Sequence, residues 1–299
     1  MKRRKAVILF IALLVSSFAI IMIYKQLKTP SEKIYAGFRT IGGLATYWVY
    51  VAKQMASAIP GTSPGGIWIL VGGLGFNAVT DNSLTVFDDN GIKVWLQVEP
   101  YSADIDQLIN DILGDYGNHS CVLGFGIDLE WRRPSSNVTD EEAQRWVNEI
   151  KQYNPDFKLF LKHYTSKVMP PTVRQDIVFI DDSQGFGSGG LESMVNEFKL
   201  WSENFSQTNV GFQIGYKWDE EWWSQLENPP RDIGLALIEN IPNCRYIYWT
   251  NETTSKVFPP STQFSTESTV AVACIVHPMR KDTHAHGSNI KYVTYTTTE

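Results

Sequence analysis

The feature that most restricts the fold is a regular alternation of apolar, strand-like runs with segments of helical spacing. Helical periodicity is clearest at residues 104–113, 140–153, 191–205 and 232–241, and Thr139 before three acidic residues predicts a capped helix start. The strand-like runs cover residues 34–38, 67–71, 93–98, 122–130, 158–163, 177–181, 210–216 and 246–250. A doubly wound open sheet shows a similar alternation, but eight strands with crossover helices favour closure. The sequence therefore predicts an α/β fold, a (β/α)8 TIM barrel, over residues 34–250.

The chain changes character at both ends of this region. Residues 251–299 lose the alternation and are predicted to form an irregular C-terminal extension. His277, His284 and His286 lie in it without an acidic or cysteine partner at ligand spacing, so no metal site is expected there.

At the other end, residues 1–28 combine four basic residues with an uncharged apolar run over residues 6–24, and residues 29–33 form a polar joint. The run is long enough to cross about 30 Å of hydrocarbon as a helix. The basic start favours an N-terminus inside the cell and a barrel outside it. A cleaved signal peptide begins in the same way, but the run is long and no Ala-x-Ala site closes it. The prediction is a single-pass signal anchor in the cell membrane.

Composition narrows the partners of the chain. A net charge of -6 argues against nucleic acid, because phosphate binding requires a concentrated basic surface. The chain has 10 Trp, and exposed aromatic rings in a cleft stack on sugar faces. The three cysteines, Cys121, Cys244 and Cys274, are too few for a disulfide framework and are expected to be buried thiols. A single disulfide between two of them is the alternative. Asn-x-Ser/Thr sequons at Asn118, Asn137, Asn204 and Asn251 are compatible with an extracellular glycoprotein.

The fourth strand-like run carries the strongest candidate for chemistry. Side chains alternate between the two faces of a strand. One face is apolar and suits packing against helices, with Leu123, Phe125, Ile127 and Leu129. The other is predicted to face the barrel interior, with Val122, Gly124, Gly126, Asp128 and Glu130. Carboxylates at the carboxyl end of a barrel strand suit acid catalysis, because close like charges raise one pKa. A structural ion pair with Lys162 is the alternative.

This segment resembles the family 18 glycoside hydrolases, chitinase-like barrels whose fourth strand carries Asp-x-x-Asp-x-Asp-x-Glu. The resemblance implies that Glu130 is the catalytic acid and that Asp128 orients an acetamido group of the substrate. The first two acidic positions are Leu123 and Gly126 here. The family also tends to carry a Tyr late in the barrel and a Trp at the end of the eighth strand, which Tyr216 and Trp249 resemble.

Polar and aromatic residues follow the other strands and should meet at the same mouth. Asp181 or Asp182 is the best candidate for a second catalytic carboxylate, and Asp181 is assigned that role beside Glu130 and Asp128. Trp218, from an aromatic and acidic segment over residues 217–223, is the preferred sugar platform, while at least one other Trp there should be core. The predicted substrate-binding residues are Glu99, Lys162, His163, Asp182, Gln184, Gln213, Tyr216, Trp218 and Trp249.

A glycine-rich stretch offers a different interpretation. Residues 73–78 fit the Gly-x-Gly-x-x-Ala dinucleotide pattern after a predicted strand. Residues 79–83 do not begin a convincing helix, and an exported location offers little nicotinamide cofactor. A rim loop and no cofactor are therefore expected.

These observations predict a membrane-anchored extracytoplasmic glycoside hydrolase that acts on a polysaccharide or glycan by carboxylate acid/base catalysis. A barrel that binds glycan without cutting it is one alternative. A structural cell-envelope protein with a vestigial mouth is the other.

Overall fold

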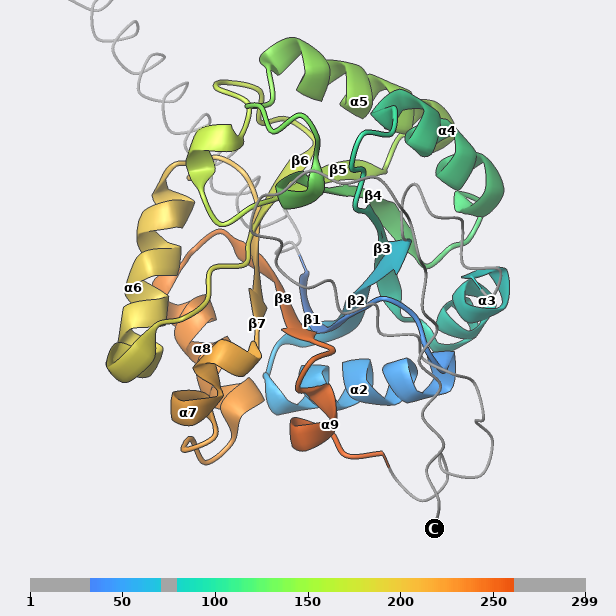
Figure 1. Ribbon diagram of the computed structural model, residues 1–299. Coiled ribbons are helices and arrows are strands. Elements are labelled where there is room, and N and C mark those ends of the chain that lie inside the picture. Colours follow the sequence, from blue (N-terminus) through green and yellow to red (C-terminus); the bar gives the residue numbers. More distant parts are fainter. Residues whose placement is uncertain (1–32, 71–79, 261–299) are drawn as a thin grey trace, which may run out of the picture. The chain divides into compact units, whose positions relative to one another are not determined.

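The computed structural model describes residues 33–70 and 80–260 of the chain, and eight parallel strands form a closed barrel in it (Figure 1). Each strand pairs with the next along the chain, and the first pairs with the eighth. The strands are β1 Ile34–Thr40, β2 Thr62–Leu70, β3 Lys93–Val98, β4 Val122–Asp128, β5 Lys158–Lys162, β6 Ile177–Asp181, β7 Val210–Ile214 and β8 Cys244–Thr250. The predicted (β/α)8 barrel is confirmed.

Helices surround the barrel in chain order (Figure 1). Thr139 begins α5 with the expected capping box, its hydroxyl accepting from the Glu142 amide while the Glu142 carboxylate accepts from Thr139. The expectation that no helix starts near residue 80 is wrong, because α3 begins at Thr80 and buries Leu84 and Phe87. The helices are α2 Ala45–Ala58, α3 Thr80–Asn90, α4 Ile105–Tyr116, α5 Asp140–Tyr153, α6 Gly190–Glu203, α7 Glu220–Trp223, α8 Pro229–Asn240 and α9 Thr254–Val257.

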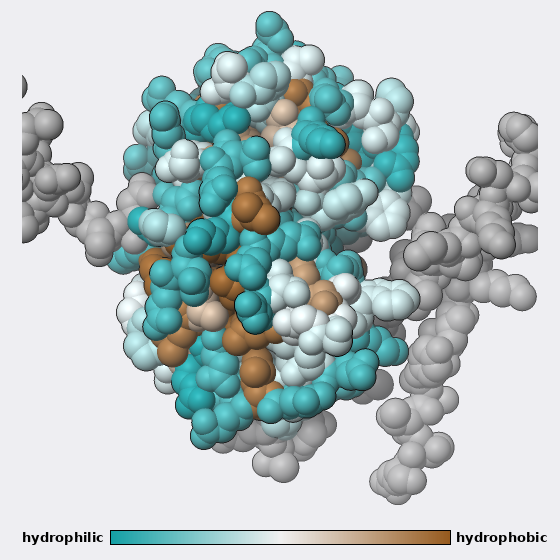
Figure 2. All heavy atoms as spheres, turned by 90° about the vertical axis from the view of Figure 1, so that its left-hand side faces the viewer, coloured by the Kyte–Doolittle hydropathy of each residue, from teal (hydrophilic) through white to brown (hydrophobic). Residues whose placement is uncertain are grey.

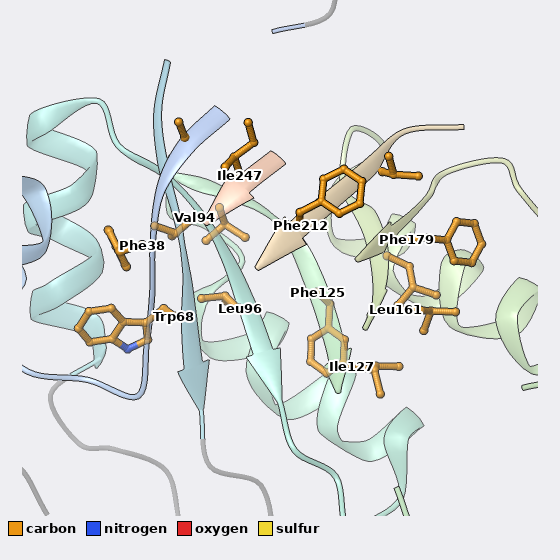
Figure 3. Close-up of a cluster of buried hydrophobic side chains, with 14 of the residues drawn as sticks. Phe38, Trp68, Val94, Leu96, Phe125, Ile127, Leu161, Phe179, Phe212 and Ile247 are labelled. Atoms are coloured by element: carbon orange, nitrogen blue, oxygen red, sulfur yellow. The ribbon is translucent and has the colours of Figure 1, made fainter. Parts of the chain in front are cut away.

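Strand alternation divides the core into two clusters. The larger cluster fills the space between strands and helices, and Figure 3 shows its strand residues, such as Phe38, Phe125 and Phe212. The smaller cluster lies inside the barrel and includes Trp95 and Phe160, whose rings meet edge to face. These apolar side chains fill the barrel interior below the mouth. Among the described residues, the polar side chains inside the barrel therefore lie at the carboxyl ends of the strands.

The predicted alternation along β4 is wrong at its start and correct at its end. The pairing with β3 shifts register between Val94 and Trp95, and Gly124 opposite the shift has φ +147°. This irregularity reverses the two faces, so that Val122 joins the helix-side core and Leu123 packs against the interior cluster. Beyond it Phe125 and Ile127 face the helices as predicted.

Gly126 is required by the ring of Phe160. A Cβ at position 126 would lie 2.0 Å from Phe160 Cε1, so the space that this glycine leaves is filled by the Phe160 side chain. Gly126→Ala is therefore expected to reduce the free energy of unfolding by about 1–3 kcal/mol through overpacking. Urea denaturation of both proteins measures this. Gly114→Ala, where a new Cβ meets nothing within 4 Å, is the matched control and should not destabilise the barrel.

The outer surface visible in Figure 2 is mainly hydrophilic, with apolar residues scattered among polar ones. Within residues 33–70 and 80–260, no helix has the length and apolar character needed to cross a membrane. The run over residues 6–24, the glycine-rich stretch at residues 73–78, the three tail histidines and Cys274 lie outside the described residues. Cys121 and Cys244 are free and buried, as expected. The predicted irregular extension begins with one short helix, α9.

Candidate active site

Lys162 is the centre of the polar layer at the barrel mouth. It ends β5, its side chain is 3% exposed, and its ammonium nitrogen lies 3.0 Å from Asp128 Oδ2 and 3.0 Å from Glu130 Oε1. The same nitrogen also contacts Asp182 Oδ2. One buried cation therefore holds three carboxylates together, and they come from the ends of β4 and β6.

A second cation extends this cluster toward β1 and β3. Arg39 lies 3.7 Å from Glu99 Oε1 and 4.0 Å from Asp128 Oδ2. Gln97 Nε2 donates to Asp128 Oδ2 over 3.5 Å. Asp128 is fully buried and is contacted by side chains from three other strands, β1, β3 and β5, which together fix its position.

Glu130 differs from Asp128 in both position and charge. β4 ends at Asp128, whose carboxylate accepts from the Glu130 amide, and a 3-10 turn over Leu129–Trp131 carries Glu130 to the rim. Its side chain is 31% exposed. Burial raises the pKa of Glu130 to about 8, and the charges of Asp182 and Asp128 add to the effect of burial while Lys162 opposes it. A protonated, solvent-accessible carboxyl at neutral pH is the state that general acid catalysis requires.

Asp182 is the carboxylate that Glu130 contacts. The two side chains are hydrogen-bonded to each other. Burial alone would raise the pKa of Asp182, but Lys162 and the hydrogen bond with Glu130 hold that pKa below its ordinary value. The pair therefore consists of one acid that keeps its proton and one carboxylate that has lost it, and their shared proton points from Glu130 to Asp182.

Asp181, the predicted catalytic residue on this strand, lies elsewhere. Its carboxylate accepts from the amide and the hydroxyl of Ser183, each over 2.8 Å, and it feels the charge of Glu197 on α6. It makes no contact with Lys162 or Glu130 among the described residues. The reason is strand alternation, because Ile180 faces the barrel interior and its neighbour Asp181 therefore faces the helices.

Three further predicted site residues lie at the same mouth. They are His163, Gln213 and Tyr216. The Tyr216 hydroxyl donates to Gln213 Oε1 over 3.1 Å, and Tyr216 is close enough to Asp182 and Lys162 to feel both charges. His163 Nδ1 accepts from the Thr165 amide, which leaves Nε2 to carry the ring proton. Burial lowers the pKa of His163, so the ring is neutral.

Trp249, predicted to shape the sugar site, does not reach the mouth. It is fully buried on the helix side of β8, where its ring meets that of Trp223 edge to face and its Nε1 donates to Thr253. Gly215 makes room for this ring, since a Cβ there would lie 2.1 Å from Trp249. Trp218 is 76% exposed, as a platform requires, whereas Trp223 is core. Gln184 is exposed.

Sequence reasoning missed Arg39 and an aromatic pair. Arg39 is the last residue but one of β1, whose predicted run stopped at residue 38, and its single charge after an apolar run was the available signal. Tyr101 and Trp131 lie with ring centroids 5.5 Å apart on the loops after β3 and β4. Tyr101 also lines a rim cavity of about 180 Å³, together with Arg132 and Arg133. The aromatic pair and this cavity extend the candidate site beyond Glu130 along the rim.

Some polar atoms in the mouth are buried without a hydrogen-bond partner among the described residues. They are Gln97 Oε1 and Gln213 Nε2. Leaving such atoms unpaired costs about 1–3 kcal/mol each, a cost that a hydroxyl-rich ligand can relieve. One donor and one acceptor are therefore available to a polar substrate.

Comparison with known proteins does not assign the chain to a family. No family model matches it, and no curated protein matches it. Similar solved structures include an endocellulase from Pyrococcus horikoshii, with 12% identity, a TM-score of 0.47, and 73% of this chain and 84% of that chain covered. A β-D-glucuronidase from Dictyoglomus thermophilum has 10% identity and a TM-score of 0.47, over 73% of this chain and 43% of that chain.

An HpcH/HpaI aldolase from Desulfitobacterium hafniense has 10% identity and a TM-score of 0.37, over 76% of this chain and 90% of that chain. The chain spans less than half the length of the glucuronidase. These proteins have different activities, and the roles of the residues at the mouth therefore follow from the geometry of this chain alone.

Proposed function

We propose that the chain is a glycoside hydrolase in which Glu130 is the general acid and Asp182, rather than Asp181, is its carboxylate partner. The observation that carries this proposal is the Glu130 carboxyl itself, which is protonated at neutral pH, partly exposed, and hydrogen-bonded to an ionised Asp182 at the mouth of the barrel. Cleavage of a glycosidic bond needs such a proton donor beside a negative charge.

In the proposed reaction, Glu130 first donates its proton and later accepts one. The proton moves from Glu130 to the glycosidic oxygen, which leaves with the electron pair of the broken bond to the anomeric carbon. Two-carboxylate glycosidases place their carboxyl groups about 5–5.5 Å or about 6.5–9.5 Å apart. Here they are in hydrogen-bond contact, which leaves no room for a sugar ring or a water between them. This contact favours capture of the anomeric carbon by the substrate's own acetamido oxygen. Water then attacks that carbon, its proton passes to Glu130, and the bond between the anomeric carbon and the acetamido oxygen breaks.

The proposal includes the location and the distant family. The apolar run at residues 6–24 would anchor the chain in the cell membrane with the barrel outside, where polysaccharides and glycans are accessible. A relationship to the family 18 hydrolases fits Glu130 and Asp128 at the end of β4. Asp182 and Lys162 would take over the charge balance that the acids missing at Leu123 and Gly126 provide in that family.

Glycan binding without cleavage is the second candidate function. It is favoured by one observation, the hydrogen bond that Lys162 donates to Glu130 Oε1 over 3.0 Å. A mouth that serves binding alone would keep Glu130 as a structural partner of Lys162.

Hydrolysis of a panel of polysaccharides by the full-length protein in detergent separates the two functions. Chitin oligosaccharides, peptidoglycan fragments and cellulose-type glucans form the panel, because the first two carry acetamido groups and the third does not. Release of new reducing ends supports the hydrolase, and preference for the first two supports the assisted mechanism. Retained binding without release of reducing ends from any glycan would leave only the binding function.

The pH profile is the most direct test of the role of Glu130. Since burial raises the pKa of this carboxyl to about 8, kcat/KM is expected to stay high through neutral pH and to fall as pH rises through about 8. The same shift affects stability. The proton held by Glu130 in the folded protein stabilises it below the unfolded pKa, and this contribution is lost as pH rises through about 8. If kcat/KM instead falls as pH rises from 4 to 6, the proton donor is another group.

Asparagine substitutions at the two neighbouring aspartates distinguish the partner of Glu130. Asp182→Asn removes a negative charge that raises the pKa of Glu130, so the alkaline limb of kcat/KM should move to lower pH and kcat should fall by roughly tenfold or more. Asp181→Asn keeps an oxygen to accept from Ser183 and should leave both unchanged. The opposite result would restore Asp181 as the catalytic partner.

A further inference from the structure

A second cluster of chemically reactive side chains lies at the end of the barrel opposite the mouth. Asp88 lies near the end of α3, while His119 and Cys121 lie between α4 and the start of β4. One His nitrogen, one Cys sulfur and one carboxylate oxygen of these residues lie within 4.8 Å of one another. None of the three belongs to the site at the mouth, and of the three only Cys121 is singled out by its sequence, as a buried thiol.

The distances within this cluster are short enough for one ion to replace the present hydrogen bonds. His119 Nδ1 lies 2.6 Å from Asp88 Oδ2. The thiol of Cys121 donates to the Leu84 carbonyl over 3.5 Å and also hydrogen-bonds Asp88. The other carboxylate oxygen, Oδ1, accepts from the Ser120 hydroxyl over 2.8 Å and from the Cys121 amide, so the Asp88 carboxylate is held with Oδ2 toward His119.

Asp81 orients the ring of His119, as a carboxylate usually does for a metal-binding histidine. Its Oδ1 lies 3.1 Å from His119 Nε2, the nitrogen that faces away from Asp88. A carboxylate on the outer nitrogen fixes the ring proton there and leaves the inner nitrogen, Nδ1, free to bind a metal. This arrangement is the carboxylate–histidine pair found around zinc ions.

We propose that Asp88, His119 and Cys121 bind a zinc ion, with Asp81 orienting His119 from the second shell. Nitrogen, sulfur and carboxylate oxygen are the donors that zinc prefers, and three protein ligands with a water complete a tetrahedron. Binding displaces the thiol proton of Cys121 and the proton between His119 and Asp88, and both leave to the solvent. The thiolate and the carboxylate then balance the two positive charges of the ion, with His119 neutral.

The proposed ion links two parts of the chain that are otherwise held by hydrogen bonds. It would join the end of α3 to the segment that leads into β4, the strand that carries Asp128 to the mouth. Its predicted role is therefore to stabilise the barrel from the far end, and the hydrolase chemistry at the mouth proceeds without it.

Cobalt and zinc titrations of the full-length, metal-stripped protein test the site. One equivalent of Co²⁺ should bind and give both the visible absorption of a tetrahedral ion and a thiolate-to-cobalt charge-transfer band. Zn²⁺ should displace it and raise the Tm. Cys121→Ser should lose the charge-transfer band, and His119→Ala should lose tight binding of the first equivalent. Asp81→Asn should weaken binding by about 10- to 100-fold.

Cys244→Ser is the matched control, because Cys244 is also buried and free but has no metal-ligating neighbours in the described part of the chain. It should retain the full cobalt spectrum. Circular dichroism of each variant excludes loss of the fold as the cause. Failure of the wild-type protein to bind one equivalent would overturn the proposal. Binding that persists unchanged in both Cys121→Ser and His119→Ala would assign the metal to other residues and overturn it equally.

Discussion

Glu130→Gln is expected to lower kcat by about 100- to 10,000-fold, the usual contribution of a general acid. Glutamine keeps the size of the side chain and can still donate from its amide to Asp182, but it has no acidic proton to give to a leaving oxygen. KM should change little, because Glu130 contributes its proton to the transition state rather than to ground-state binding. Initial rates on a hydrolysed glycan from the panel measure the effect.

Glu239→Gln on the exposed end of α8 is the control for this substitution, since it makes the same chemical change away from the mouth. It should retain the wild-type rate. Glycan binding should survive in Glu130→Gln, and aryl glycosides with acidic leaving groups should lose less activity because they need less proton donation. A variant as active as the wild type on every substrate would remove Glu130 from the mechanism and leave Lys162 as its structural partner.

Lys162→Met is expected to reduce the free energy of unfolding by about 3–5 kcal/mol at pH 7, because it leaves Asp128, Glu130 and Asp182 without the cation between them. Their charges raise the pKa of Lys162 well above its ordinary value against the opposite effect of burial, so the stabilisation is fully present at neutral pH. Urea unfolding of both proteins measures the difference.

Acid should reduce this defect. As pH falls, Asp128 and Asp182 take up protons and their repulsion disappears, so the difference between Lys162→Met and the wild type should shrink between pH 7 and pH 5. Lys256→Met is the control, because Lys256 pairs with Glu220 at the surface with its side chain 52% exposed. Its loss should cost about 1 kcal/mol or less. Equal effects of the two substitutions would mean that the buried cluster does not stabilise the barrel.

The barrel could be predicted from local pattern because each strand and helix repeats one periodicity over several residues. The run at residues 177–181 and the helix at residues 140–153 match β6 and α5 at both ends. α3 was missed because Thr80, Asp81 and Asn82 are weak helix formers, and its stability comes from burying Leu84 and Phe87 against the barrel. Tertiary packing overrode propensity there.

The candidate site was predicted unevenly for a related reason. Alternation counted back from the end of β4 correctly assigns Asp128 to the interior, whereas counting forward from Val122 fails across the irregularity at Gly124. At β6 the two aspartates are adjacent, and sequence alone offered no way to choose between them. Ile180 inside the barrel decides the choice in favour of Asp182. Trp249 was misplaced because the end of a strand specifies the mouth but not the face.

The sequence by itself determined the eight alternating units and the presence of carboxylates at the end of the fourth strand, because both depend on periodicities of the local backbone. Only the tertiary structure decided which carboxyl keeps its proton. The pKa of Glu130 depends on burial and on Asp182 and Lys162, which lie 52 and 32 positions away in the chain. Charges at such separations act through space, and closure of the barrel is what brings them within reach.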